Sequence, residues 1–290
     1  MPNQMPGNGK KIYILGATGF LGASATDYFR AKGYQLLTDR IDVTDRIGLE
    51  KQFQKTKPDT VINLVGAKAS PNIDWCEDHK EETVAINVGG AINVMLAAFK
   101  VGAYPIQISS GCIYSGGSEY AFTEEDEPNF YGSFYSRMRI VLQKTLAELP
   151  VLYARIRMPI SSTPYPKNII TKIAAYPKVI SAPNSVTLID DLWPALEKLF
   201  KLKITGILNL TNEGYVDHRQ ILRAYKKIVN PSHHYELIAL EKLDGPNGIT
   251  KAKRSNCVLS VEKAKNLGIN MLTLTDDRIE EIMKKYKTSQ

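Results

Sequence analysis

Three side chains that can exchange protons fall within one short stretch of the chain, Ile108 to Leu142. Ser110 and Cys112 stand in the apolar segment ISSGCIY, and Tyr135 follows in FYSRMRIVLQKTLAE, which has helical periodicity. Because strand side chains alternate, we expect Ser110 and Cys112 on the same face at the end of a strand. Arg139 lies one helical turn after Tyr135 and would place a cation beside the phenol. These four groups form a candidate acid-base cluster.

The first strand and the loop after it indicate a dinucleotide site. A short apolar strand, Lys10 to Leu15, leads directly into GATGFLG, and a helical pattern follows. Glycines at Gly16, Gly19 and Gly22 let the backbone approach a pyrophosphate, whose charge the helix N-terminus stabilises. A glycine triplet alone is a weak signal, but its place between the first strand and the first helix favours a dinucleotide loop over a chance turn.

The end of the second strand bears on the choice of cofactor. Tyr34 to Thr38 is followed by Asp39 and Arg40, where such proteins contact the adenosine ribose. An acid accepts from the 2′-hydroxyl, whereas a guanidinium pairs with a 2′-phosphate. Both are present, and we favour Arg40 and NADPH. Asp42 and Val43, in IDVTD, suit an adenine-edge contact, although DVTD could also cap the next helix, and both roles can hold.

The elements that must position these groups alternate strand and helix. Further apolar strands are TVINLV and VLYARIRMPI, and the alternation predicts an α/β fold with a doubly wound parallel sheet. In such sheets ligands bind at the carboxyl ends of the strands, where the glycine loop, Ser110 and Cys112 fall. Asn87 is polar within an apolar helical stripe, so it is either a satisfied core amide or a group that orients neighbouring backbone.

The pattern changes from about Ser161 onward. Proline-punctuated loops, short helices and the strand GILNLTN indicate a smaller, interrupted C-terminal lobe. We predict a flexible tail (1–10), a Rossmann-like dinucleotide-binding domain (11–160), and a mainly substrate-binding lobe (161–290) with possible returns to the sheet. Donors of this lobe could hold a diphosphate or sugar, although each alone is more often a solvated surface group. They are Lys167, Asn168, Lys172, Arg254 and Asn256.

The bulk composition narrows the class of protein. The 290 residues are 43% hydrophobic and 23% charged, which is ordinary for a soluble globular protein. The net charge of +7 is spread along the chain, so it favours small anions such as nucleotides over nucleic acid. No apolar run reaches about 18 residues, so we expect no membrane span. Three widely spaced cysteines suit a reducing, cytoplasmic compartment, and His233–His234 lacks the other ligands of a metal site.

With the glycine loop, Ser110 and Tyr135, the chain resembles an extended short-chain dehydrogenase/reductase. The segments SPNIDWCEDHKEET, EEDEPNFYGSFYS, RIRMPISS, KNIITKIA, PNSVTLIDDLWP and AKRSN narrow the resemblance to UDP-4-keto-6-deoxyglucose 3,5-epimerase/4-keto-reductases, which complete UDP-L-rhamnose synthesis. The similarity runs from roughly Lys11 to Tyr286. GSFYS and RMPISS are its specific parts, whereas GATGFLG and DVTD are common to a wider group that includes dTDP-4-dehydrorhamnose reductases.

The resemblance implies a bifunctional enzyme that uses NADPH and a nucleotide sugar. Cys112 and Lys172 would exchange the acidic protons at carbons 3 and 5 from opposite faces, in an order that the sequence leaves open. Tyr135 would protonate the carbon-4 oxygen while Ser110 hydrogen-bonds it. Arg139 stands where the family has lysine; it keeps the positive charge but cannot join a proton relay. Two long helices beside the sheet, around Ile86 to Phe99 and Tyr135 to Leu149, could form the bundle of a homodimer.

The resemblance also assigns contacts to both ligands, with Arg40 at the family's position for the 2′-phosphate. The implied cofactor contacts are Gly16, Thr18, Gly19, Phe20, Leu21, Gly22, Arg40, Asp42, Val43, Gly66, Ala67, Asn87, Met158 and Pro159. The implied substrate contacts are Asn72, Trp75, Asn168, Arg254 and Asn256. UDP and dTDP remain alternatives for the nucleotide of the sugar.

Two other functions compete with this one. A monofunctional dTDP-4-dehydrorhamnose-type reductase would receive sugar that is already epimerised and would need no thiol at Cys112. A non-catalytic NADP-binding regulatory subunit would explain the departure at Arg139. The joint presence of Ser110, Tyr135, Cys112 and Lys172 argues against that subunit.

Overall fold

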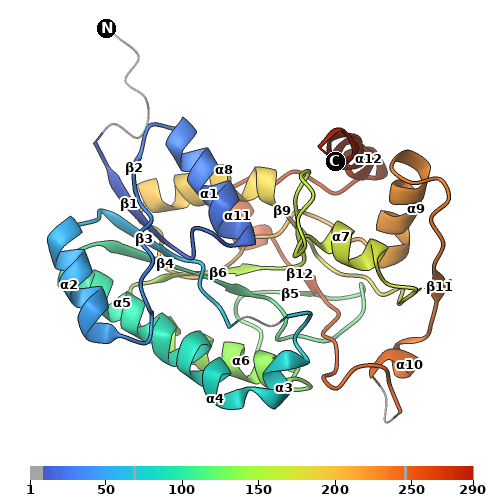
Figure 1. Cartoon of the computed structure of the whole chain (residues 1–290), viewed down its shortest axis with the longest axis horizontal. Helices are drawn as coiled ribbons and strands as arrows, with labels where there is room; N and C mark the ends of the chain where they lie inside the picture. The colour runs from blue at the N-terminus through green and yellow to red at the C-terminus, as the bar shows by residue number, and fades with distance from the viewer. Residues whose placement is uncertain (1–8, 68–69, 245–246, 290) are drawn as a thin grey trace, which may run out of the picture. The chain divides into compact units, whose positions relative to one another are not determined.

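In the computed structural model, six strands form one sheet in the order β10-β6-β4-β3-β1-β2 (Figure 1). The pairs β1–β2, β1–β3 and β3–β4 are parallel, which confirms the predicted doubly wound α/β fold. The structure describes residues 9–67, 70–244 and 247–289, so the predicted tail lies outside the described residues except for its last two. The strands are β1 (Lys11–Leu15), β2 (Gln35–Leu37), β3 (Thr60–Asn63), β4 (Tyr104–Ser110), β6 (Leu152–Ile156) and β10 (Gly206–Asn209).

The chain divides into two compact units that alternate along the sequence. They are similar in size, whereas the sequence predicts one boundary near residue 160 and a smaller second lobe. Unit 1 comprises Met1–Ser109, Phe134–Ala154 and Leu196–Leu208. Unit 2 comprises Ser110–Ser133, Arg155–Ala195 and Asn209–Gln290.

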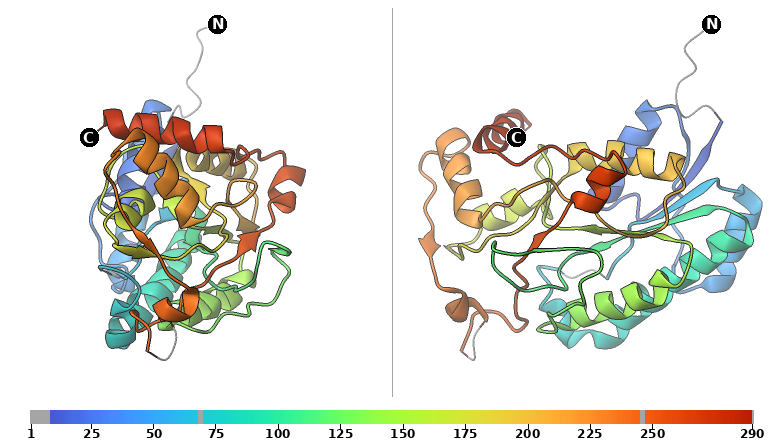
Figure 2. Two further views of the ribbon diagram at one scale, coloured as in Figure 1. Left: turned by 90° about the vertical axis from the view of Figure 1, so that its right-hand side faces the viewer. Right: turned by 180° about the vertical axis from the view of Figure 1, so that it is seen from behind.

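Helices cover both faces of the sheet in unit 1. Figure 1 and Figure 2 show α2, α5 and α6 on one face and α1 on the other. The apolar core of the first face joins Tyr13 and Val61 of the strands to Phe53, Val94 and Leu142 of these helices. Burial of both faces explains why β3 and β4 are buried at every position. The helices are α1 (Phe20–Ala31), α2 (Arg46–Thr56), α3 (Trp75–Asp78), α4 (Lys80–Val84), the π-helix η1 (Ala85–Gly90), α5 (Ala91–Lys100), α6 (Phe134–Ala147) and α8 (Ile189–Lys201), which enters unit 1 at Leu196.

One helical stretch, Lys80–Lys100, is long and apolar enough to cross a membrane by length and composition. It contains α4, η1 and α5, and α5 packs against α2. Ala91, Val94 and Met95 of this stretch are at most 2% exposed and belong to the apolar core. Packing in the core therefore uses part of this apolar stretch, of which 44% is buried.

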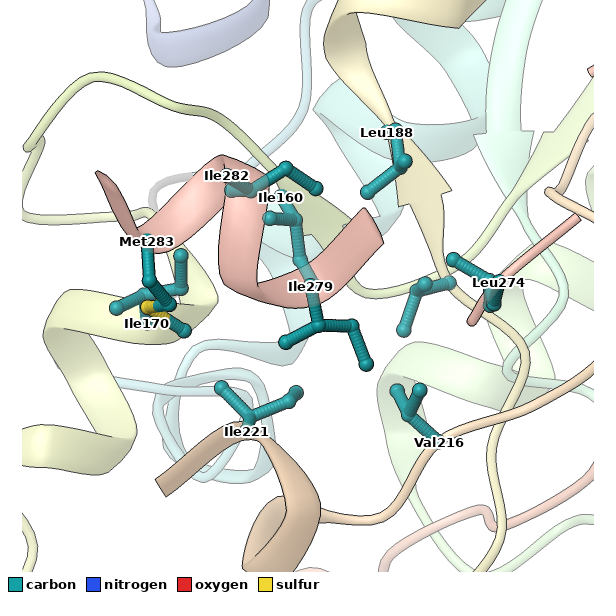
Figure 3. Close-up of a pocket in the computed structure, with 10 residues that line it drawn as sticks. Ile160, Ile170, Leu188, Val216, Ile221, Leu274, Ile279, Ile282 and Met283 are labelled. Carbon is teal, nitrogen blue, oxygen red and sulfur yellow. The ribbon is translucent and has the colours of Figure 1, made fainter. Parts of the chain in front are cut away.

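Unit 2 is built around a second apolar cluster, to which α7, α9 and α12 contribute Ile170, Ile221 and Ile282. Figure 3 shows the side chains that line a cavity of about 10 Å³ within this cluster. A water molecule requires about that volume and also polar partners, so the cavity is a packing void and not a substrate site. The elements of this unit are β5 (Ala121–Phe122), β7 (Pro159–Ile160), α7 (Ile169–Ala174), β8 (Lys178–Val179), β9 (Thr187–Leu188), α9 (His218–Ile228), β11 (Glu236–Leu237), α10 (Leu240–Asp244), β12 (Val258–Leu259), α11 (Glu262–Asn266) and α12 (Asp276–Thr288).

Two predicted strands differ from the observed ones. VLYARIRMPI breaks into β6 and β7 because Met158 adopts φ 39°, in the left-handed region, where a strand cannot continue. ISSGCIY is a strand only up to Ser110. Cys112 lies in the turn that follows, so the prediction that strand alternation places it beside Ser110 is wrong.

Candidate active site

The turn from β1 to α1 has the geometry of a dinucleotide loop. Gly16 has φ 79°, and a Cβ there would lie 3.2 Å from the carbonyl carbon of Leu64, just after β3. A Cβ at Gly22 would lie 2.0 Å from the Gly16 oxygen, so only glycine lets α1 pack this closely on the loop. Strand order reverses between β1 and β3, which is where nucleotides bind in such sheets.

The helix that follows this loop presents backbone donors. Gly19 is its N-cap residue and provides no side-chain hydrogen bond to the first turn. Thr18 lies in the loop, and Phe20 and Leu21 begin α1. Backbone N–H groups at such a helix start can bind phosphate oxygens.

A cavity of about 360 Å³ opens beside the end of β2. The Asp39 carboxylate accepts a hydrogen bond from Gln52 Nε2 at 3.0 Å, so one of its oxygens already has a partner within the protein. Arg40 and Lys55 bring two cations to the cavity wall, which favours a phosphate over a bare ribose. Lys55 was not predicted because it comes from α2, and only the fold brings it next to Arg40. The cavity is lined by Tyr13, Asp39, Arg40, Ile41, Gln52, Lys55 and Thr56.

The segment DVTD caps α2, as one of the two sequence interpretations proposes. Asp45 is the N-cap residue and accepts from the Gly48 amide at 2.9 Å. Asp42 accepts from the amide and the hydroxyl of Thr44, and these hydrogen bonds hold the pKa of Asp42 below its usual value. Val43 is buried in the core. An adenine contact by Asp42 and Val43 stays a prediction.

Tyr135 and Arg139 lie one turn apart on α6, with the guanidinium carbon 5.0 Å from the centre of the phenol ring. Arg139 is only 7% exposed, yet its Nε and Nη1 have no hydrogen-bond partner among the described residues. Nδ2 of Asn87, in η1, also has none in the described part of the chain. A Cβ on Gly66 would lie 3.2 Å from Arg139 Nη2 and 3.5 Å from Asn87 Oδ1, so both side chains border the backbone after β3.

These three unpaired nitrogens are the strongest sign of a ligand in unit 1. Buried donors are nearly always satisfied in folded proteins, so this set requires acceptors from outside the described chain. Hydroxyl and carbonyl oxygens, such as those of a nicotinamide riboside, are suitable acceptors. The residues therefore fit NADPH, with the glycine loop for its pyrophosphate and the Arg40 cavity for its adenosine end.

Asn87 also orients backbone, which decides between its two sequence interpretations. Its Oδ1 accepts from the Ala67 amide at 2.8 Å and fixes the chain just after β3. Asn87 is carried by the π-helix η1, an irregularity that is frequent at functional sites.

Ser110 and Cys112 do meet in unit 2, but through a turn. The Cys112 amide donates to Ser110 Oγ at 3.1 Å. Arg157, just after β6, donates from Nη1 to the Cys112 sulfur at 3.2 Å. Arg157 is not among the site residues that the sequence predicts. Its position inside the apolar run VLYARIRMPI could have indicated a role, because an arginine in a buried strand needs polar partners. Arg157 is indeed only 2% exposed.

Lys172 lies in the last turn of α7. Burial, and then the charges of Arg254 and Lys167, lower the pKa of Lys172 below its usual value. The side chain of Asn168 builds this helix: its Oδ1 accepts from the Ile170 amide, and its amide donates to the Ser161 and Thr163 carbonyls. The positive charges of Arg254 and Lys167 therefore act on Lys172, and an anionic substrate would suit this positive environment.

The other predicted contacts are placed as follows. Asn72 accepts from the Asp74 amide in unit 1, and Trp75 stacks on His79 with ring centres 4.1 Å apart. In unit 2, Asn256 Oδ1 accepts from Asn184 at 3.0 Å. Met158 precedes β7, and Pro159 is the first residue of β7.

Among the described residues, no group of His, Cys, Asp or Glu could hold a metal ion.

Comparison with known proteins identifies the family. The model of the RmlD substrate binding domain matches residues 10–177. A bifunctional dTDP-4-dehydrorhamnose 3,5-epimerase/dTDP-4-dehydrorhamnose reductase of Arabidopsis thaliana is 35% identical, over 96% of this chain and 94% of that protein. The chain belongs to this epimerase/reductase family.

Two further relatives are named for rhamnose formation, and their similarity to this chain confirms the resemblance. A trifunctional UDP-glucose 4,6-dehydratase/UDP-4-keto-6-deoxy-D-glucose 3,5-epimerase/UDP-4-keto-L-rhamnose-reductase of Arabidopsis thaliana is 35% identical over 93% of this chain and 41% of its own length. The L780 UDP-rhamnose synthase of Acanthamoeba polyphaga mimivirus has a crystal structure that matches with a TM-score of 0.88 at 30% identity. That match covers 95% of this chain and 99% of that one.

Replacing Gly22 with alanine tests the dinucleotide loop. The new methyl group would overlap the Gly16 oxygen, so the loop must move, and we expect the affinity for NADPH to fall about tenfold or more. Gly89→Ala is the matched control, because a Cβ there meets only the Val84 oxygen, at 4.0 Å. Titration of NADPH fluorescence measures both affinities, with circular dichroism to verify folding. Unchanged affinity in a folded Gly22→Ala protein would exclude this loop from the cofactor site.

Proposed function

We propose that this protein converts UDP-4-keto-6-deoxy-D-glucose to UDP-L-rhamnose, by epimerisation at carbons 3 and 5 and NADPH-dependent reduction at carbon 4. Membership of the epimerase/reductase family supports the reaction class. The observation that carries the epimerase half is the hydrogen bond from a buried guanidinium to the Cys112 sulfur. A plain reductase has no use for a thiol held in this way.

Cys112 and Lys172 are the proposed acid-base pair for epimerisation. The ketone at carbon 4 makes the neighbouring carbon-bound protons acidic, because the electron pair left on carbon can move onto the ketone oxygen. One residue removes the proton and the other returns a proton to the opposite face, which inverts the centre. The lowered pKa of Lys172 makes it a better proton donor when charged, and makes its neutral amine more available than that of an ordinary lysine.

Tyr135 is the proposed proton donor for the reduction. When bound, NADPH supplies the hydride that carbon 4 receives. Tyr135 gives its phenolic proton to the oxygen, and the Arg139 cation beside the ring stabilises the phenolate that remains. Ser110 Oγ accepts from the Cys112 amide, so its own hydrogen remains available for donation to a substrate oxygen. Arg139 and Asn87 have the buried donors to hold the nicotinamide end of the cofactor.

The same proposal covers the assembly and the cellular setting. Val84 on α4 and Val141 on α6 are 42% and 46% exposed, and these two helices pack together in unit 1. Exposed apolar side chains on two packed helices support a homodimer. The three free cysteines support a reducing, cytoplasmic location. A nucleotide sugar is the proposed partner, with neither nucleic acid nor a membrane involved.

The decisive experiment for this function uses Cys112→Ala. We expect entry of solvent deuterium at carbons 3 and 5 to slow roughly 10²- to 10⁴-fold, while already epimerised keto-sugar is still reduced. Cys257→Ala is the matched control, since Cys257 is the other cysteine of unit 2. NMR of the product with UDP- and dTDP-linked substrates measures exchange and nucleotide preference. Undiminished exchange in Cys112→Ala would leave only the monofunctional reductase.

Arg139→Lys tests the departure from the family pattern. Lysine keeps the positive charge beside the phenol, so we expect the rate of reduction to fall less than about tenfold. Arg139→Met, which removes the charge, should be far slower. Stopped-flow oxidation of NADPH measures both rates. Complete inactivity of Arg139→Lys would instead show that the planar guanidinium itself is required.

Arg40→Gln tests the cofactor preference. Loss of a charged contact to the 2′-phosphate should lower kcat/KM for NADPH roughly 10- to 100-fold and leave kcat/KM for NADH nearly unchanged. Arg46→Ala is the control, because Arg46 is a surface arginine paired with Glu50 at 2.8 Å. An equal loss with both cofactors would argue against a 2′-phosphate contact.

A further inference from the structure

Arg157 is a buried cation without an acidic partner. It is 2% exposed, and no carboxylate pairs with it among the described residues. A buried guanidinium usually requires a negative partner, because its desolvation is costly. The ionisable groups whose negative charge would stabilise it most are thiols, those of Cys257 and Cys112.

Protein groups hold the Arg157 side chain in one orientation. Asn184 Oδ1 accepts from Nε at 3.0 Å and also from Nη2. The Ser255 carbonyl accepts from Nη2 at 2.6 Å, and the Ser255 hydroxyl accepts from Nη1 at 3.2 Å. The remaining Nη1 hydrogen is directed at the Cys112 sulfur at 3.2 Å. All five N–H groups of the guanidinium thus donate hydrogen bonds, one of them to the Cys112 sulfur.

The two neighbouring cysteines are not equivalent. Cys257 is fully buried, and its sulfur donates to the Gly111 carbonyl at 3.6 Å, as a neutral thiol does. Burial raises the pKa of Cys257. Cys112 is partly exposed and accepts from the guanidinium. The positive charge is therefore placed to act on Cys112.

We propose that Arg157 is a positioning residue for epimerisation, which aims the Cys112 sulfur and stabilises negative charge on it while Cys112 exchanges a proton with the substrate. The inference rests on the proposed function of Cys112. As Cys112 takes a proton from carbon 3 or 5, the electron pair of that C–H bond moves onto the ketone oxygen and the sulfur becomes a neutral thiol. The electron pair then moves back from the oxygen, so that the ketone re-forms and the carbon takes a proton from the ammonium of Lys172 on the other face. Both groups regain their starting states by proton exchange with water. Arg157 stays protonated throughout.

Three variants and one matched control test this role. Arg157→Gln removes the positive charge, and Arg157→Lys keeps the charge but not the planar guanidinium. Asn184→Ala removes the oxygen that accepts a hydrogen bond from Arg157 Nε. Arg155→Lys is the control, since Arg155 is fully buried on β6 and donates to the Thr123 carbonyl at 3.2 Å and to Asn209 Oδ1 at 3.3 Å. Circular dichroism verifies the folding of each full-length protein.

Two rates are measured on each protein. The first is solvent-deuterium entry at carbons 3 and 5 of UDP-4-keto-6-deoxyglucose, without NADPH. The second is alkylation of Cys112 by iodoacetamide at neutral pH, followed by peptide mass spectrometry. For Arg157→Gln we expect both rates to fall roughly 10- to 100-fold, with KM changed only a few-fold. Arg157→Lys should recover part of both losses, and Arg155→Lys should behave as the unaltered protein.

The outcomes separate this inference from the proposed function. Wild-type exchange and alkylation rates in Arg157→Gln would overturn the role of Arg157 and leave the epimerase intact. If Arg157→Gln does not fold, wild-type rates in both Arg157→Lys and Asn184→Ala would overturn it. Absence of exchange in the unaltered protein would refute the epimerase function, and the alkylation rates alone would then decide whether Arg157 acts on the sulfur.

Discussion

The burial of charged guanidinium groups is the constraint on which the candidate site depends. Removing such a group from water costs several kcal/mol, which is recovered only through well-placed partners. Arg139 in unit 1 and Arg157 in unit 2 are 7% and 2% exposed, and neither has a carboxylate partner among the described residues. Arg139 instead lies over the ring of Tyr135, and Arg157 donates to the sulfur of Cys112. Each buried charge therefore lies next to a side chain that we propose to handle a proton.

The surrounding elements keep these two cations in place. In unit 1, the π-helix carries Asn87, whose hydrogen bond to the Ala67 amide fixes the backbone next to Arg139. In unit 2, the break between β6 and β7 comes directly after Arg157, at Met158, and Asn184 and Ser255 hold the guanidinium from segments distant in sequence. Local irregularity and long-range hydrogen bonds thus appear at the same positions, as expected where strain serves function.

The alternation of apolar strand and helix patterns along the sequence was sufficient to predict the fold class. The alternating apolar runs and the glycine loop are local patterns, and the sheet and its flanking helices follow from them. Ser110 and Cys112 were predicted together for the wrong reason, because a turn and not strand alternation joins them. Arg157 and Lys55 were missed, since their importance comes from partners about 45 and 15 residues away along the chain. Residue type indicates candidate chemistry, but only the folded chain shows which cation serves which group.

Arg157 and Arg139 differ in whether protein groups accept all their hydrogen bonds, and this difference agrees with a reaction in which epimerisation precedes reduction. Proton exchange at carbons 3 and 5 depends on the carbon-4 ketone, and reduction destroys that ketone, so epimerisation must come first. Every N–H group of the Arg157 guanidinium donates a hydrogen bond to a protein group, including the Cys112 sulfur. The hydrogen bonds around Cys112 therefore form without a cofactor. Arg139 has two buried donors for which the described chain offers no acceptor, and oxygens of a bound cofactor would satisfy them. The half of the reaction that needs no hydride is therefore built from the protein itself, and the half that needs one is left to be completed by the cofactor.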